Sequence, residues 1–219
     1  MFPGKPLIIA IDGPAASGKS TVARRVADGL GLTFVNSGAM YRAFTWWVLK
    51  RGIDPEDGPA VLSLLDDTHF VCGQEKGRGT IAVGKTGETV TALDAPQLCS
   101  AEVNRNVSAV AALAEVRERL VAEQRKYAEE GGVVMEGRDI GSVVFPDTPF
   151  KFYIDASPEV REQRRRAQGI TDAIAERDRK DSSRKASPLL VAEDALVIDS
   201  SDLSAAEVVD KVLVEIRSR

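Results

Sequence analysis

Cysteine, histidine and long apolar runs are scarce in this 219-residue chain. The two cysteines, Cys72 and Cys99, form neither a CxxC pair nor a disulfide framework, so we expect reduced thiols. The single histidine, His69, is expected to be structural or to face solvent rather than to be catalytic. No apolar stretch approaches the length of a membrane span, and the N-terminal MFPGKP lacks the apolar segment of a signal peptide. We therefore expect a cytoplasmic protein with no membrane partner.

An excess of positive charge is also missing. Lys and Arg number 29 against 33 Asp and Glu, a formal net charge of −4, so the overall charge does not suggest a nucleic-acid binder. Hydrophobic residues make up 43% of the chain, which is enough for one ordinary domain with a sizeable core and an inserted lobe.

Five short apolar runs end in polar or glycine-rich breaks. Their continuous hydrophobicity is typical of parallel strands covered on both faces. The runs are Leu7–Ile11, Leu32–Val35, Val133–Met135, Phe150–Ile154 and Ala195–Ile198. Helical patterns lie between or after them, over Ser20–Leu30 and from about Ser204, where Glu207 completes a capping box. This alternation predicts an α/β fold with a parallel sheet.

One segment departs from this pattern. From Thr68 to Ala95 the chain is rich in Gly, Thr and Val, with the turn signals GQEKGRG and GKTGE. The segment is predicted to be a small antiparallel sheet inserted into the main domain.

Residues 8–21, IIAIDGPAASGKST, contain a phosphate-binding motif. Gly13–Ser20 matches G-x-x-x-x-G-K-[ST] between a predicted strand and a predicted helix, which is the context that the motif requires. Glycines let backbone N–H groups surround phosphate oxygens, Lys19 can reach the β- and γ-phosphates, and the Ser20 hydroxyl can bind Mg²⁺. The chain lacks the NKxD of GTPases and an apolar strand that ends in Asp-Glu, so a small-molecule kinase remains.

A kinase of this kind needs a second site with positive charge. Ser37 and Arg42 follow the second predicted strand, and the sequence EGRD at 136–139 follows the third. Ligands of open α/β sheets bind at these carboxyl ends of strands. Nearer the C-terminus, three charged residues share one helix face through i, i+4, i+7 spacing: Arg177, Asp181 and Arg184.

Together these segments resemble bacterial cytidylate kinase over nearly the whole chain. The resemblance is carried by Gly13–Ser20, by SGAMYR at 37–42, by GRDIGSVVFP at 137–146, and by the Arg177, Asp181, Arg184 triplet. It implies transfer of the γ-phosphoryl group of ATP to CMP or dCMP with Mg²⁺, by a cytoplasmic monomer. It also implies a three-layer nucleoside monophosphate kinase fold with a five-stranded parallel sheet. The expected parts are a P-loop core at 1–67 and 106–219, a CMP-binding insert at 68–105, and a short lid at about 164–184.

The resemblance also implies the site residues. Those expected to bind ATP are Gly13, Pro14, Ala15, Ala16, Ser17, Gly18, Lys19, Ser20 and Thr21. Those expected to bind CMP are Ser37, Arg42, Ser108, Arg117, Arg138, Asp139, Arg177, Asp181 and Arg184. Lys19, Arg138 and Arg184 are the expected catalytic groups, and Ser20 is the expected metal ligand.

Hydrogen-bond chemistry agrees with a cytosine base. Cytosine presents an N4 amino donor, and a carboxylate such as Asp139 accepts from it. Uracil presents an O4 acceptor instead, so a buried Asp139 would face a carbonyl oxygen. Unpaired buried polar groups of this kind reject an analogue by roughly 10⁴ or more.

Several alternatives remain open from the sequence. Asp12, Glu136 or Asp155 could order Mg²⁺ through water, since each ends a strand. Asn36 stands where the family often has Asp, and the lid segment is shorter than in many relatives. A P-loop kinase for another small acceptor, such as UMP or shikimate, would keep the phosphate loop. The nine Lys and Arg against five Asp and Glu in 160–186 could instead belong to a nucleic-acid-binding module.

Overall fold

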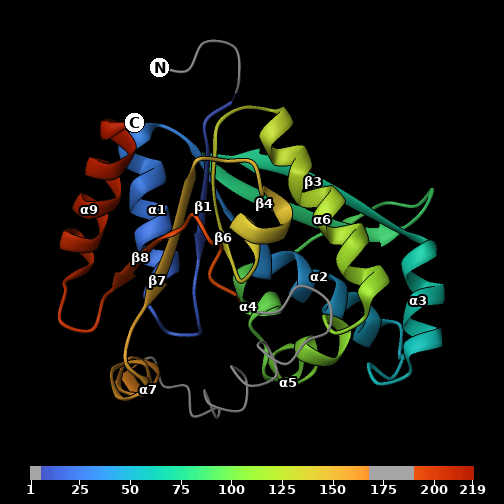
Figure 1. Ribbon diagram of the computed structural model, residues 1–219. Helices are drawn as coiled ribbons and strands as arrows, with labels where there is room; N and C mark the ends of the chain where they lie inside the picture. Colours follow the sequence, from blue (N-terminus) through green and yellow to red (C-terminus); the bar gives the residue numbers. More distant parts are fainter. Residues whose placement is uncertain (1–5, 168–189) are drawn as a thin grey trace. The chain divides into compact units, whose positions relative to one another are not determined.

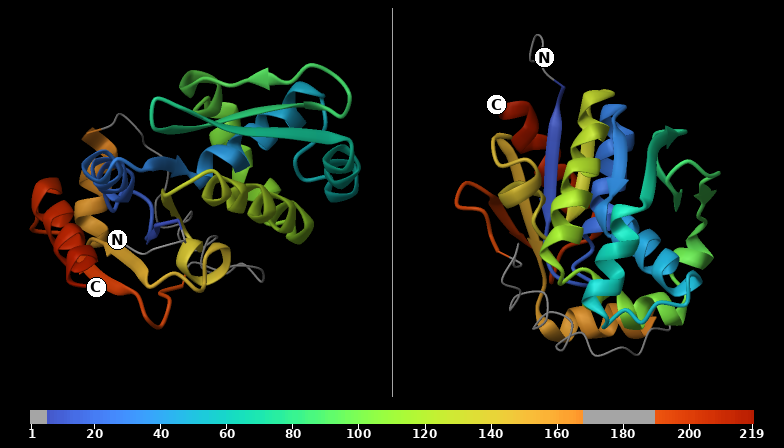
Figure 2. Two further views of the ribbon diagram at one scale, coloured as in Figure 1. Left: turned by 90° about the horizontal axis from the view of Figure 1, so that it is seen from above. Right: turned by 90° about the vertical axis from the view of Figure 1, so that its right-hand side faces the viewer.

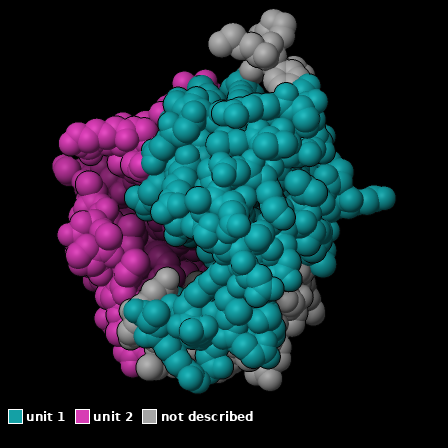
Figure 3. Space-filling view, turned by 90° about the vertical axis from the view of Figure 1, so that its left-hand side faces the viewer, with its two compact units in different colours: residues 1–35, 131–219 teal, residues 36–130 magenta. Residues whose placement is uncertain are grey.

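The computed structural model describes residues 6–167 and 190–219. The chain divides into two compact units, coloured separately in Figure 3. Unit 1 comprises residues 1–35 and 131–219, and unit 2 comprises residues 36–130. Unit 2 is therefore a continuous stretch of sequence that interrupts unit 1.

Unit 1 contains strands in the order β2-β6-β1-β7-β8 (Figure 1). Their bounds are Ile8–Asp12 for β1, Thr33–Asn36 for β2, Val133–Gly137 for β6, Phe150–Asp155 for β7 and Leu196–Asp199 for β8. β1 pairs in parallel with both β6 and β7, and β7 pairs in parallel with β8. The five predicted strands are confirmed, because each apolar run coincides with one of these strands to within two residues at either end. Their expected burial on both faces is wrong for β8, in which Leu196 and Val197 are exposed. The described residues contain eight strands in all, three more than the expected five-stranded sheet.

Helices α1 (Lys19–Leu30) and α9 (Ala205–Ser218) lie side by side in unit 1 (Figures 1 and 2). Their apolar faces join the strands in one core that excludes water, which is the main source of stability for such a layer. The fully or almost fully buried members include Ile9, Ile11, Val22, Val26, Phe152, Ile154, Val208 and Val212. The short π-helix η1 (Ile140–Val144) lies between β6 and β7 in the sequence, and α7 (Pro158–Ala167) follows β7.

The first turn of α9 is closed by the predicted capping box. The Ser204 hydroxyl accepts a hydrogen bond from the Glu207 backbone N–H at 3.3 Å. The Glu207 carboxylate accepts one from the Ser204 N–H at 2.8 Å. These bonds satisfy two backbone donors that no helical carbonyl can reach.

Unit 2 contains five helices and three strands. The helices are α2 (Ser37–Lys50), α3 (Gly58–Asp66), α4 (Ala95–Leu98), α5 (Ala101–Val110) and α6 (Ala114–Glu129). Strands β3 (Thr68–Glu75), β4 (Arg78–Lys85) and β5 (Thr91–Ala92) pair antiparallel. The β3–β4 turn places Lys76 and Gly77 at φ 49° and 71°, the positive values that a tight hairpin requires. The predicted antiparallel sheet within Thr68–Ala95 is thereby confirmed.

None of the helices in the described parts of the chain is both long and apolar enough to cross a membrane.

The capping box of α9 makes a first prediction. Ser204→Ala should lower the free energy of unfolding by about 1 kcal/mol, because the Glu207 N–H loses its acceptor. Ser204→Asp is the matched control, since its carboxylate keeps an acceptor at the same place, and it should cost little. Urea denaturation of the three proteins measures the difference. Equal stability of the Ala and Asp variants would contradict a capping role for the side chain.

Candidate active site

The phosphate loop of unit 1 joins β1 to α1, as its motif requires. Gly13 lies at φ 149°, and a Cβ there would stand 2.1 Å from the Ile154 carbonyl oxygen of β7. Gly18 lies at φ 91° immediately before α1. Both positions therefore require glycine, one for close approach to a neighbouring strand and the other for a left-handed turn.

Lys19 and Ser20 begin helix α1 and face the end of β6. The buried Lys19 ammonium donates to the Pro14 carbonyl oxygen at 3.0 Å and lies 4.0 Å from a Glu136 carboxylate oxygen. The Ser20 hydroxyl donates to the other Glu136 oxygen at 2.8 Å. The loop thus presents a cation, a hydroxyl and a carboxylate within one small region, which are the groups that bind a phosphate and its magnesium ion.

The three carboxylates that end strands have different surroundings. Asp155 accepts a hydrogen bond from the N–H of the next residue, Ala156, at 2.8 Å. The buried Asp12 accepts from backbone N–H groups of η1. Burial raises the pKa of Asp12 to about 7, although these N–H bonds act in the opposite direction. Of the three candidates, Glu136 is the one whose carboxylate contacts the Ser20 hydroxyl.

The EGRD segment places Arg138 and Asp139 directly after β6. One Arg138 guanidinium nitrogen donates to the Gly13 carbonyl oxygen at 2.5 Å, so the segment contacts the phosphate loop. Asp139 is 4% exposed and immediately precedes η1. The predicted phosphate-binding arginine therefore contacts the start of the phosphate loop, and the predicted base-reading carboxylate is the next residue in the chain.

Two arginines of α7 support the phosphate loop from outside any motif. Arg161 donates to the Ala15 carbonyl oxygen at 3.3 Å, and Arg164 donates to the Ser17 carbonyl oxygen at 3.1 Å. Arg164 also donates to the backbone oxygen of Ser200 at 2.7 Å. Their sequence signal is an i, i+3 spacing on a basic helix directly after a strand. Two of the arginines in the basic 160–186 segment are thus used to hold the phosphate loop.

In unit 2, Arg42 is oriented by the last residue of α4 and by a side chain of α5. It donates to the Leu98 carbonyl oxygen at 3.4 Å and to the Asn104 side-chain oxygen. The Asn104 amide in turn donates to the Cys99 carbonyl oxygen at 2.8 Å. No motif signalled Asn104, because this contact joins residues 62 apart in the sequence.

Asn36 and Ser37 begin helix α2. The Asn36 side chain accepts from the Ala39 N–H at 3.2 Å and caps the helix. A neutral Asn fulfils this role as well as Asp does, so the departure from the family residue keeps the helix start intact. Ser37 is buried at the same point.

Arg117 of α6 is a buried cation in unit 2, only 3% exposed. Its guanidinium donates to the Ala111 carbonyl oxygen at 3.3 Å and lies 5.4 Å from the centre of the Tyr41 ring. Ser108 lies half-buried on the adjacent helix α5. Arg177, Asp181 and Arg184 lie outside the described residues.

Comparison with solved structures shows the fold that these elements form. A gluconokinase from Sinorhizobium meliloti is 13% identical with a TM-score of 0.51, covering 97% of this chain and 93% of its own. A sugar kinase from Janibacter is 14% identical with a TM-score of 0.51, covering 97% and 95%. Such low identities establish a shared fold and leave the substrate undetermined.

Sequence comparison gives a narrower result. The family model described as cytidylate kinase matches residues 9–218. A cytidylate kinase from Streptococcus pneumoniae strain Hungary19A-6 is 42% identical over 227 aligned positions, covering 98% of this chain and 99% of its own. The enzyme from strain G54 is also 42% identical with the same coverage. The chain therefore belongs to the cytidylate kinase family.

Proposed function

We propose that this protein transfers the γ-phosphoryl group of ATP to CMP or dCMP, the activity expected of its family. The observation that supports this most directly is the hydrogen bond from Arg138 to the Gly13 carbonyl oxygen. It joins the loop that would bind the donor to the segment that would bind the acceptor. Phosphoryl transfer requires donor and acceptor phosphates to be held close and in line, and this contact supports such positioning.

The donor side is proposed to be the phosphate loop itself, residues 13–21. Its backbone N–H groups and the N-terminus of α1 suit phosphate oxygens, and Lys19 adds a positive charge near the transferring group. Arg161 and Arg164 hold carbonyl oxygens of this loop from outside. A peptide carbonyl points away from the N–H of the same peptide plane, so these bonds favour N–H groups turned toward the ligand.

The residues around Ser20 fit a magnesium ion. Mg²⁺ prefers oxygen ligands and is commonly bound through one or two protein groups together with substrate phosphates and water. The Ser20 hydroxyl and the buried Glu136 carboxylate, 2.8 Å apart, supply oxygens of that kind. When bound, the ion would neutralise phosphate charge. We propose Ser20 as a direct ligand and Glu136 as the carboxylate that orders the ion.

The acceptor side is proposed to combine residues that the resemblance identified. For the CMP phosphate these are Arg42, Arg138 and Arg184, whose planar guanidinium groups suit bidentate contacts. For the ribose they are Asp181 and Arg177, and for the base and its surroundings Ser37, Ser108, Arg117 and Asp139. The CMP-binding insert at 68–105, the lid at about 164–184 and a monomer acting in the cytoplasm likewise stay predictions.

Catalysis needs no dedicated general base, because the nucleophile is the phosphate of CMP and is already an anion. ATP and CMP together carry about six negative charges at neutral pH, so charge neutralisation is the main requirement. Lys19 and the proposed arginines supply it without a proton transfer. Positioning and electrostatic stabilisation then account for the rate enhancement.

An acceptor panel tests the activity directly. The purified protein is incubated with ATP, Mg²⁺ and one of CMP, dCMP, UMP, AMP or shikimate, and ADP release is measured. We expect rapid turnover with CMP or dCMP and little with the others, because only cytosine offers an amino donor to Asp139 among the pyrimidines. Preferred turnover of UMP or shikimate would contradict the proposed acceptor.

The magnesium assignment predicts a selective change in metal requirement. Glu136→Gln should raise the Mg²⁺ concentration needed for half-maximal activity, because the charge that orders the ion is removed while the acceptor for Ser20 remains. Asp155→Asn, which changes the carboxylate at the end of β7, should leave that requirement unaltered. Titration of activity with Mg²⁺ at fixed ATP gives both values. A raised Mg²⁺ requirement in Asp155→Asn, with none in Glu136→Gln, would assign the ion to Asp155.

The base-reading role of Asp139 predicts a change in substrate ratio. Asp139→Asn should reduce kcat/KM for CMP by about 10- to 100-fold, because a charge-assisted hydrogen bond is lost. The UMP rate should fall less, since the Asn amide can turn to donate to the uracil O4. The ratio of CMP to UMP activity is the quantity to measure, because general damage to the site cancels. An unchanged ratio would leave Asp139 as a support for its neighbours.

A further inference from the structure

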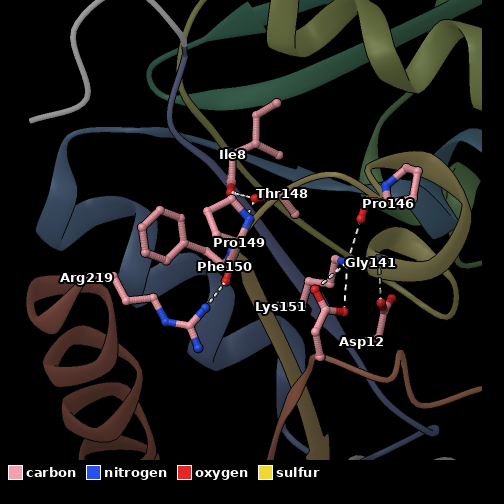
Figure 4. A network of polar contacts seen from close by, with 10 residues as sticks. Ile8, Asp12, Gly141, Pro146, Thr148, Pro149, Phe150, Lys151 and Arg219 are labelled. Carbon is pink, nitrogen blue, oxygen red and sulfur yellow. Dashed lines mark hydrogen bonds and ion pairs between the residues drawn. The ribbon is translucent and has the colours of Figure 1, made fainter.

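Asp12 is buried at the end of β1, one residue before the phosphate loop, and its carboxylate is fully engaged with another segment. One of its oxygens accepts a hydrogen bond from the Ile140 N–H and the other from the Gly141 N–H, each at 2.8 Å. Only 5% of the residue is exposed. Figure 4 shows the Asp12 side chain beside Gly141. The acidic side chain is therefore hydrogen-bonded to the backbone at the start of η1.

The geometry of the sheet explains this contact. β1 and β6 run parallel with Asp12 paired to Gly137, so the chain leaving β6 starts next to Asp12. It passes through Arg138 and Asp139 and enters η1 at Ile140. The first N–H groups of any helix have no partner within the helix. The Asp12 carboxylate accepts from the two at the start of η1.

The far end of the same segment is held by a second buried charge. Lys151 of β7 donates to the Pro146 carbonyl oxygen at 2.6 Å (Figure 4). It also donates to both Asp194 oxygens at 2.8 Å. The segment from Asp139 to Pro146 is thus held near its start by the Asp12 carboxyl group and at its end by the Lys151 ammonium group.

Gly141 lies between these two fastenings. A Cβ at this position would stand 3.1 Å and 3.2 Å from carbons of the Lys151 side chain and 3.4 Å from an Asp12 oxygen. Because glycine has no Cβ, the backbone at this position can approach Lys151 closely enough for its N–H to reach the Asp12 carboxylate. The glycine of the GRDIG sequence thus has a physical reason that is independent of any ligand.

We propose that Asp12 is a positioning residue for the acceptor nucleotide, because its carboxylate holds the backbone immediately after Asp139. This inference rests on the roles proposed above for Arg138 and Asp139. Together with the bond from Arg138 to Gly13, three hydrogen bonds fasten residues 138–141 to residues 12 and 13. Asp12 thereby keeps the acceptor-binding side chains at a constant distance from the ATP loop.

The test is Asp12→Asn, with binding of CMP and of a non-hydrolysable ATP analogue each measured alone by calorimetry. An amide offers one acceptor and one donor, so one of the two backbone N–H groups loses its partner. We expect the Kd for CMP to rise about 10- to 100-fold, the factor for one lost charge-assisted bond, while the Kd for the analogue stays unchanged. Asp147→Asn, an exposed acid just after η1, is the matched control and should change neither value.

A second variant covers the case in which Asp12→Asn does not fold. Gly141→Ala keeps the Asp12 carboxylate but adds a Cβ 3.1 Å from a Lys151 side-chain carbon, so the backbone at 141 or the Lys151 side chain must shift by a few tenths of an ångström. It should weaken CMP in the same selective way. Two results, in whichever variant folds, would overturn the proposal. An equal loss of CMP and analogue binding would mean that Asp12 supports the phosphate loop alone. No loss of either would mean that Asp12 supports nothing at the site.

Asp139→Asn, measured in parallel, separates this proposal from the base-reading role. An unchanged ratio of CMP to UMP activity in that variant would defeat base reading, while the CMP affinity of Asp12→Asn still tests positioning through Arg138.

The double variant Asp12→Asn with Asp139→Asn adds a coupling measurement. We expect a combined loss of CMP affinity smaller than the product of the single losses, because both changes disturb one turn. Fully multiplicative losses would contradict positioning of Asp139 by Asp12.

Discussion

The parallel pairing of β1 with β6 is the constraint on which the rest of the site depends. The register sets Ile11 beside Glu136 and Asp12 beside Gly137, so both strands end at the same edge of the sheet. Neighbouring strands are about 4.8 Å apart. The segment that follows β1 therefore starts one strand spacing away from the segment that follows β6. A phosphate loop after one strand and an Arg-Asp turn after the other become neighbours without any long side chain to join them.

Backbone hydrogen bonding then determines how these two segments are shaped. Three carbonyl oxygens of the phosphate loop, at Gly13, Ala15 and Ser17, accept from Arg138, Arg161 and Arg164. Buried or partly buried peptide groups need partners, and arginine supplies several donors in a fixed plane. Three cations thus hold the loop that is proposed to bind ATP. Two arginines of α7 are therefore explained by the need of loop carbonyl oxygens for hydrogen-bond donors, as much as by any ligand.

In unit 2, arginine side chains also donate to backbone carbonyl oxygens, and a side-chain amide and an aromatic ring contact them as well. Arg42 is directed by a backbone carbonyl of Leu98 and by the side chain of Asn104, which Cys99 holds in turn. Arg117 lies against the Tyr41 ring and a carbonyl oxygen at the end of α5. These two arginines thereby contact neutral groups, whereas Arg119 of the same unit pairs with the Glu123 carboxylate at 3.4 Å.

The sequence by itself determined the strands, the phosphate loop and the cap of α9, because these depend on residues close together in the chain. Continuous apolar runs specify buried parallel strands, and the Ser204–Glu207 capping box and Gly13–Ser20 are local patterns. It also identified a family through motifs of the same local kind. Only the tertiary structure decided that Glu136 faces Ser20 and that Asp12 holds η1. These contacts join residues 116 and 128 apart, and no local pattern selects among carboxylates that all end strands.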